Sequence, residues 1–257
     1  MSEPKGIFKG WLKKYASSDV IIVGAGPSGL MAAWDLARLN LKTLVIERNI
    51  HAGGRLWASD FLIPASKSAA QFKEILDELN IPYKKGHSGL CVNAGPSVAA
   101  KFILAACDAG VRILTQGEFK DLIYAQEKIA GVEIDWNPQL SLEDKAYATA
   151  VVSLKSQVVI DASGVDACVC QSLIKRGVID LKKYGSIDIR TAESLFLEKT
   201  GLIYPGLACT GMSVAAIYGI PPVGLTLCSL LLSGRKVAQE VEMFFAENYT
   251  GLYKGRR

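Results

Sequence analysis

The amino-acid sequence predicts an α/β fold in which an antiparallel hairpin crosses over a parallel sheet. Residues 20–23 are a short, apolar, β-branched run, typical of a buried parallel strand, and residues 28–39 have the apolar spacing of a helix packed on a sheet. Residues 119–136 alternate apolar and polar side chains on both sides of a polar turn, which predicts the hairpin. Residues 158–161 are a further buried strand.

The junction between the first strand and the first helix carries three glycines, Gly24, Gly26 and Gly29. Gly24 permits the turn, Gly26 lets the backbone approach a pyrophosphate, and Gly29 lets the helix close onto the strand. A second strand, residues 42–46, ends before Glu47, where an acid accepts ribose hydroxyls. The pattern predicts a Rossmann-like FAD/NAD(P)-binding fold. The choice between FAD and NAD stays open, because an acid at Glu47 serves either ribose.

The remaining elements are predicted along the chain. An amphipathic N-terminal helix at residues 1–17 precedes a single dinucleotide-binding domain at residues 18–257. Helices are predicted at residues 68–79, 96–109 and 223–240, and strands at residues 111–114, 147–160 and 206–210, with polar turn residues interrupting 147–160. The N-terminus of the last helix is expected to return to the glycine cleft.

Composition and charge limit the function classes. The formal net charge of +4 is spread along the chain, and no basic stripe with interleaved aromatic residues predicts a nucleic-acid partner. The longest apolar stretch, residues 224–232, is too short to span a membrane, and the N-terminus has no signal-peptide core, so a cytoplasmic protein is expected. The 6 cysteines lack paired metal-ligand spacing and are interpreted as reduced, mostly buried thiols.

Several motifs run in order through nearly the whole chain: SDVIIVGAGPSGLMAAWDLA, VIERNIHAGGRLW, GVEIDWN, VVIDASGVDA, YPGLACTGM and LLLSGRKVA. With these motifs the chain resembles the thiamine thiazole synthase family, especially its short archaeal members, some of which are labelled ribose-1,5-bisphosphate isomerase. The resemblance implies a homo-oligomer, often an octamer, that binds an adenine dinucleotide. It also implies the family chemistry, in which NAD and glycine are consumed to build an adenylated thiazole carboxylate.

The chain departs from the family pattern in its catalytic half. The resemblance places Ala150 and Val165 at the family's iron-binding aspartate and histidine, and neither side chain can ligate a metal, so no metal site is expected. The sulfur-donating cysteine, or the histidine that replaces it, would lie within residues 141–149, which contain neither. Pro222 stands where the family has an arginine that holds the glycine carboxylate. These departures predict an altered active site.

The predicted site combines cofactor contacts with candidate catalytic groups. The predicted cofactor contacts are Gly24, Gly26, Ser28, Gly29, Glu47, Arg48, Gly54, Arg55, Asp161, Gly164, Gly211 and Met212. Arg55 completes an E-x6-G-R pattern, which is similar to flavoproteins whose arginine faces the cofactor phosphates, and a surface ion pair is the alternative role. The candidate catalytic residues are His51, Asp60 and Cys209.

Three hypotheses for the function follow from this pattern. The first is an enzyme that binds FAD or NAD and performs different chemistry in nucleotide or thiazole-related metabolism, or as a flavin oxidoreductase. The second is a thiazole synthase with rearranged catalytic groups. The third is a non-catalytic paralogue that binds a nucleotide and assembles with itself or with a true synthase. A bound flavin with a reducible spectrum would favour an oxidoreductase.

Overall fold

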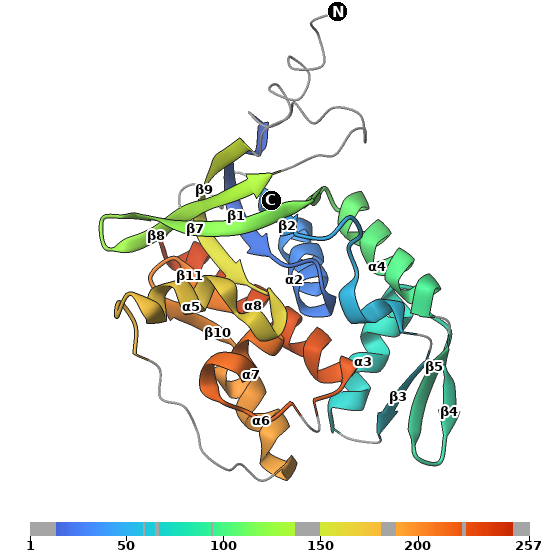
Figure 1. The fold of residues 1–257 in the computed structure, drawn as a ribbon. Coiled ribbons are helices and arrows are strands. Elements are labelled where there is room, and N and C mark those ends of the chain that lie inside the picture. Colours follow the sequence, from blue (N-terminus) through green and yellow to red (C-terminus); the bar gives the residue numbers. More distant parts are fainter. Residues whose placement is uncertain are drawn as a thin grey trace, which may run out of the picture.

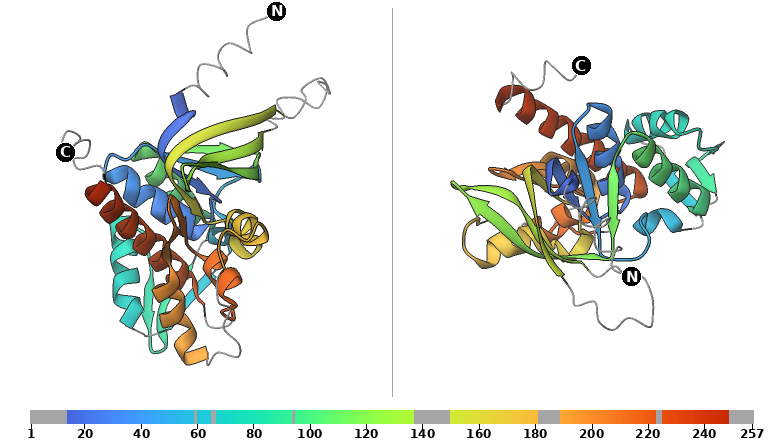
Figure 2. Two further views of the ribbon diagram at one scale, coloured as in Figure 1. Left: turned by 90° about the vertical axis from the view of Figure 1, so that its left-hand side faces the viewer. Right: turned by 90° about the horizontal axis from the view of Figure 1, so that it is seen from above.

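The computed structural model describes residues 14–58, 60–64, 67–93, 95–136, 150–180, 189–222 and 225–248. They form an α/β structure with a central sheet between two layers of other elements (Figures 1 and 2). Most of the predicted N-terminal helix, through residue 13, lies outside the described residues. Among the described residues, no helix combines the length and the apolar character needed to cross a membrane.

The central sheet confirms the predicted fold class. Its strands follow the order β10-β11-β9-β1-β2-β6. They are β1 (Ser17–Val23), β2 (Thr43–Glu47), β6 (Arg112–Thr115), β9 (Ala150–Asp161), β10 (Gly201–Tyr204) and β11 (Leu207–Cys209). The neighbours of β1 on both sides are parallel to it, and β10 is antiparallel at one edge. The carboxyl ends of β1, β2 and β9 therefore meet at one edge of the sheet, where ligands bind in such folds.

The hairpin of β7 (Gly117–Ala125) and β8 (Lys128–Trp136) is confirmed. Its two-residue turn places Gln126 and Glu127 at φ of 52° and 61°, as a hairpin with right-handed strand twist requires. The sequence predicted that polar turn residues interrupt the strand at residues 147–160. For residues 150–160, which the structure describes, this prediction is wrong, because β9 is one continuous strand. Its first half pairs with β8, and its second half pairs with β1 and β11. Polar residues are tolerated there because the ladder hydrogen bonds continue through them.

The longer helices lie close to their predicted positions. They are α2 (Pro27–Arg38), α3 (Lys67–Glu78), α4 (Gly95–Asp108) and α8 (Leu227–Asn248), of which α8 begins and ends later than predicted. Other elements had no predicted bounds: α5 (Cys168–Lys175), α6 (Ile189–Lys199), α7 (Met212–Tyr218), the 3-10 turns η1 (Gly54–Trp57) and η2 (Gly164–Asp166), and a small sheet of β3 (Asp60–Pro64), β5 (Gly89–Asn93) and β4 (Lys84–Gly86).

The two faces of the central sheet bury separate apolar cores. Val20 and Ile22 of β1 face one core, where they pack with α2, α3, α4 and α8. Ile21 and Val23 face the other, with the hairpin and helices α5, α6 and α7. All four side chains are buried, which matches the period of two in a strand covered on both faces. The burial holds β1, and the loop that follows it, in a fixed position.

Candidate functional site

The glycine loop at the carboxyl end of β1 is fixed by close backbone contacts. Gly24 has a φ of +108°, and a Cβ added there would lie 2.2 Å from the carbonyl oxygen of Ala162. A Cβ added at Gly29 would lie 2.0 Å from the carbonyl oxygen of Gly24. Both distances are far below van der Waals contact, so the loop excludes any side chain at these two positions.

Gly26 differs from its two neighbours in the motif, because a Cβ added there would meet no atom within 4 Å. Its backbone, at φ −76° and ψ −173°, is one that other residues also adopt. Helix α2 begins immediately afterwards with Pro27, and no side chain caps its N-terminus. Open space at Gly26 beside an uncapped helix N-terminus is what a pyrophosphate needs for close approach. The loop therefore fits the predicted phosphate group.

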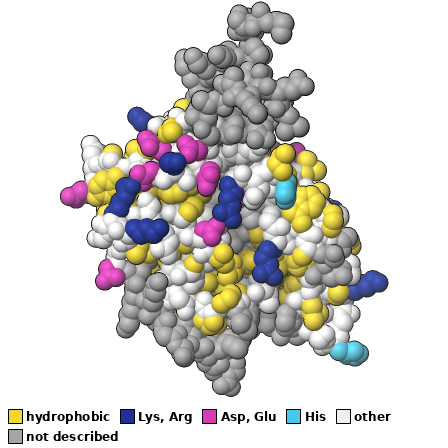
Figure 3. Space-filling model, in the orientation of Figure 1, with side chains coloured by type: hydrophobic (Ala, Val, Ile, Leu, Met, Phe, Trp, Pro, Cys, Tyr) yellow, Lys and Arg dark blue, Asp and Glu magenta, His cyan; other side chains and the backbone are white. Residues whose placement is uncertain are grey.

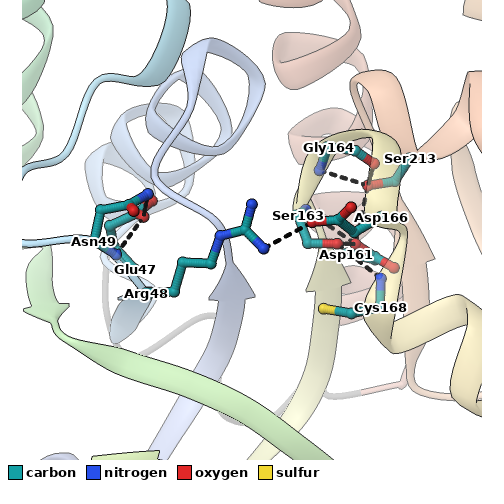
Figure 4. A network of polar contacts seen from close by, with 9 residues as sticks. All are labelled: Glu47, Arg48, Asn49, Asp161, Ser163, Gly164, Asp166, Cys168 and Ser213. Atoms are coloured by element: carbon teal, nitrogen blue, oxygen red, sulfur yellow. Dashed lines mark hydrogen bonds and ion pairs between the residues drawn. The ribbon is translucent and has the colours of Figure 1, made fainter. Parts of the chain in front are cut away.

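Glu47, predicted to accept ribose hydroxyls, already holds protein donors (Figure 4). Its carboxylate accepts the Ala25 backbone N–H at 2.9 Å, the Asn49 backbone N–H at 2.8 Å and the Asn49 side-chain amide at 2.7 Å. The residue is only 7% exposed. Glu47 therefore braces the glycine loop against the end of β2, and Oε2, with one bond, retains capacity to accept another.

Asp161, at the end of β9, is the centre of a buried polar network (Figure 4). It is 0% exposed. It accepts hydrogen bonds from the Ser163 backbone N–H and hydroxyl, the Ser213 hydroxyl and the Cys170 backbone N–H, at 2.7 to 3.0 Å. The network joins β9 to η2, α5 and α7. Asp161 thus holds these elements in position, and it exposes no surface of its own to a ligand.

Arg48 and Asp166 form an ion pair between the end of β2 and η2 (Figure 4). Arg48 Nη1 lies 2.7 Å from Asp166 Oδ2, and the side chains are 63% and 48% exposed. Since β1 lies between β2 and β9 in the sheet, the pair spans the end of β1. Such an exposed pair contributes little to stability, about 0 to 1 kcal/mol, so it can separate when a ligand enters.

The loop after β2 packs directly on the glycine loop. The Gly53 N–H donates to the Ala25 carbonyl at 2.8 Å, and a Cβ added at Gly54 would lie 3.2 Å from the Gly26 Cα. Arg55 follows with an exposed side chain, and no hydrogen bond or ion pair joins it to the described residues. Gly54 and Arg55 are therefore close to the predicted phosphate position.

Gly211, one of the predicted cofactor contacts, lies against α2. A Cβ added there would lie 2.4 Å from the Ser28 hydroxyl, and the Gly211 N–H donates to the Ser233 hydroxyl at 2.9 Å. The Ser233 hydroxyl is also within hydrogen-bond distance of Thr200 and Thr210 in the interior. The structure thus brings Gly211, and Met212 after it, to the start of α2. The sequence motif LLLSGRKVA contained Ser233 but gave no sign of this role.

The candidate catalytic residues are less well placed. His51 is exposed, and its ring centroid lies 6.3 Å from that of Trp57. Asp60 lies on β3, and its side chain is outside the described set. Cys209 is 0% exposed, and burial raises the pKa of its thiol. A protonated and enclosed thiol cannot attack a substrate, so the geometry argues against a catalytic Cys209.

The two positions at which the resemblance places the family's metal ligands carry no side-chain donor atom. Val165 in η2 is 70% exposed and has no donor atom, while Ala150 is the first residue of β9. Within the described ranges, no cluster of three or more His, Cys, Asp or Glu residues could hold a metal ion. Gly164, next to Val165, has a φ of +84° and open space where a Cβ would lie.

Comparisons with known proteins show which family and which solved structure this chain is similar to. The Thi4 family model matches residues 5–227. Thiamine thiazole synthase of Aeropyrum pernix is 40% identical over 227 residues, which cover 88% of this chain and 84% of that protein. Thiamine thiazole synthase of Archaeoglobus fulgidus is 37% identical over 235 residues, which cover 90% of this chain and 88% of that protein. The crystal structure of Thermovibrio ammonificans THI4 superposes with a TM-score of 0.79 at 25% identity, covering 93% of this chain and 94% of that chain.

Proposed function

The chain belongs to the Thi4 family of thiamine thiazole synthases, and on this basis we propose that it is an enzyme that binds FAD or NAD and has an altered active site. The open space at Gly26, beside an uncapped helix N-terminus, carries the proposal. The pyrophosphate would lie there, with the adenosine ribose toward Glu47. When bound, FAD would supply redox chemistry and NAD a hydride acceptor or an ADP-ribosyl moiety.

The altered active site is inferred from the residues at the family's reactive positions. Val165 and Ala150 lack donor atoms, and Pro222 lacks a charge for a carboxylate. The chain's own groups around the cleft bind and orient: Glu47 braces the glycine loop, and the Asp161 network holds η2. The substitutions support a reaction other than thiazole synthesis by iron and a sulfur donor.

The identity of the nucleotide is tested by a visible spectrum of the purified protein and mass spectrometry of what heat releases. Flavin bands would establish FAD and direct the search to an oxidoreductase. Released NAD or ADP-ribose would establish the NAD branch, whereas a released adenylated thiazole would favour the second hypothesis, a thiazole synthase with rearranged catalytic groups. Protein that binds neither FAD nor NAD in calorimetric titration would contradict the proposal, whereas bound nucleotide that never turns over would favour the non-catalytic paralogue.

Glu47→Ala tests the assigned orientation of the nucleotide. We expect the dissociation constant for the bound dinucleotide to rise by an amount equivalent to about 1.5 to 3 kcal/mol, because a charge-assisted hydrogen bond is lost. The variant also loses the Ala25 brace, so Glu47→Gln, which retains an acceptor oxygen, is the matched control. An unchanged dissociation constant in Glu47→Ala would refute the ribose assignment.

A further inference from the structure

A pocket of about 220 Å³ lies between η1, β3 and the start of α8. It is lined by Arg55, Phe61, Leu62, Leu225, Thr226, Leu227 and Leu230. The volume equals that of about seven molecules of liquid water, at roughly 30 Å³ each. It is smaller than the volume of pockets that hold drug-sized ligands, which is about 300 Å³ or more. The pocket suits a small molecule.

The described lining combines apolar walls with a cation. Of the described lining side chains, five are Leu or Phe, and Arg55 is the only charged one. The Thr226 hydroxyl is engaged in the first turn of α8, where it accepts the Ser229 backbone N–H at 3.3 Å and lies 3.2 Å from the Ser229 hydroxyl. The Arg55 side chain, in contrast, makes no hydrogen bond or ion pair with the described part of the chain. This side chain is exposed and lines the pocket.

We propose that this pocket binds a small carboxylate with an apolar body. The guanidinium of Arg55 pairs with the carboxylate in the planar two-bond geometry that suits these groups. The leucine side chains and Phe61 enclose the body, which gains free energy by leaving water. A phosphate dianion fits less well, because a single cation leaves its second charge unpaired beside apolar walls.

The pocket lining begins next to residues that pack on the glycine loop. Arg55 directly follows Gly54, which packs against Gly26, and the preceding Gly53 donates to the Ala25 carbonyl. Arg55, at one end of the pocket, is therefore one residue along the chain from Gly54, which contacts the glycine loop. Figure 3 shows exposed hydrophobic side chains among scattered basic and acidic groups on the face of the molecule that is seen in Figure 1. The binding of a carboxylate in this pocket does not depend on the proposed function. Only a role of that carboxylate as the substrate would rest on the proposed function.

The first experiment compares 4-methylpentanoate with the neutral, similarly shaped 4-methylpentanamide by calorimetric titration of the full chain. We expect the carboxylate to bind at least about tenfold more tightly, as expected for a charge-assisted hydrogen bond. Inorganic phosphate is titrated in the same way, and we expect it to bind more weakly than the carboxylate. Equal affinity for acid and amide, or tighter binding of phosphate, would overturn the proposal.

Variants locate the site. Arg55→Gln should remove the preference for the acid over the amide. Leu62→Asp should weaken carboxylate binding by charge repulsion, and this change is tolerated by the fold because Leu62 is 58% exposed. Lys175→Gln, on α5 and away from the pocket lining, is the matched loss of one exposed positive charge and should leave carboxylate affinity unchanged.

Titration of FAD and NAD into the same variants separates this inference from the proposed function. Leu62→Asp with weakened carboxylate affinity and normal dinucleotide affinity supports the pocket as a separate subsite. If Arg55→Gln loses affinity for the dinucleotide but still prefers 4-methylpentanoate over the amide, Arg55 is assigned to the cofactor and the inference is overturned. Selective carboxylate binding by a chain that binds neither dinucleotide would leave the inference standing and refute the proposed function.

Discussion

The glycine loop after β1 and the η2 turn after β9 lie at neighbouring strand ends, yet their side-chain positions differ greatly in how closely other atoms surround them. In the loop, a Cβ at Gly24 or Gly29 would lie within 2.2 Å of a backbone oxygen. In η2, Val165 is 70% exposed, and the buried Asp161 beneath it carries the structural contacts. The contrast shows that the nucleotide cradle is part of the packing. Val165, where the resemblance places a reactive group of the family, is exposed instead.

The largest expected effect is at Gly29. Gly29→Ala should lower the free energy of unfolding by about 2 kcal/mol or more, because the new Cβ would overlap the Gly24 carbonyl oxygen and force α2 away from β1. Urea denaturation measures the change. A variant as stable as the wild type would mean that the loop adjusts freely, and the contrast between loop and turn would disappear.

Gly26→Ala separates binding from folding in the same loop. Open space and an ordinary backbone conformation predict unchanged stability of the ligand-free chain. The added methyl group occupies the predicted phosphate position, so dinucleotide affinity should fall by about tenfold or more, equivalent to 1.4 kcal/mol. Calorimetric titration measures the affinity, with Gly29→Ala as the stability reference. Normal affinity in Gly26→Ala would place the pyrophosphate elsewhere.

Cys168, just after η2, tests whether this region holds a reactive thiol. Burial raises the pKa of Cys168 to about 11, so alkylation by iodoacetamide should be slow at pH 7 and accelerate as the pH rises toward that value. The unfolded chain releases this proton near pH 9, whereas the raised pKa of the folded chain is about 11. The raised pKa therefore contributes its full stabilisation of the folded state below pH 9, and this contribution is lost as the pH rises through about 11. Mass spectrometry of the Cys168 peptide follows the reaction, and rapid alkylation at pH 7 would contradict the prediction.

The smallest expected effect is at the ion pair across the end of β1. Arg48→Gln should change the free energy of unfolding by less than about 1 kcal/mol, because both partners are largely exposed. Asp166→Asn should have an equally small effect, and the double variant should show little coupling between the two changes. A loss of several kcal/mol in urea denaturation would show that η2 depends on this pair, and that the region is as constrained as the loop.

Much of the site depended on local patterns that the sequence displays directly. Gly24, Gly26 and Gly29 were predicted from their spacing between a β-branched run and an apolar helix, because each glycine acts through its own backbone conformation or its near neighbours. The hairpin was predicted for the same reason, since alternation and a short polar turn are local features. The family resemblance was also carried by short motifs, and it is confirmed.

Other features depended on contacts between distant residues, which no local pattern reports. The Glu47 bond to Ala25, the Asp161 network and the Ser233 bond to Gly211 join elements that only the sheet order brings together. Helix α7 and the small sheet around β5 are short, and they are stabilised by packing rather than by a long periodic pattern. The sequence by itself determined the nucleotide-binding loop and the fold class. Tertiary structure decided that Glu47 and Asp161 brace the site, and that Arg55 lines a separate pocket, because burial and hydrogen-bond partners exist only once the chain is folded.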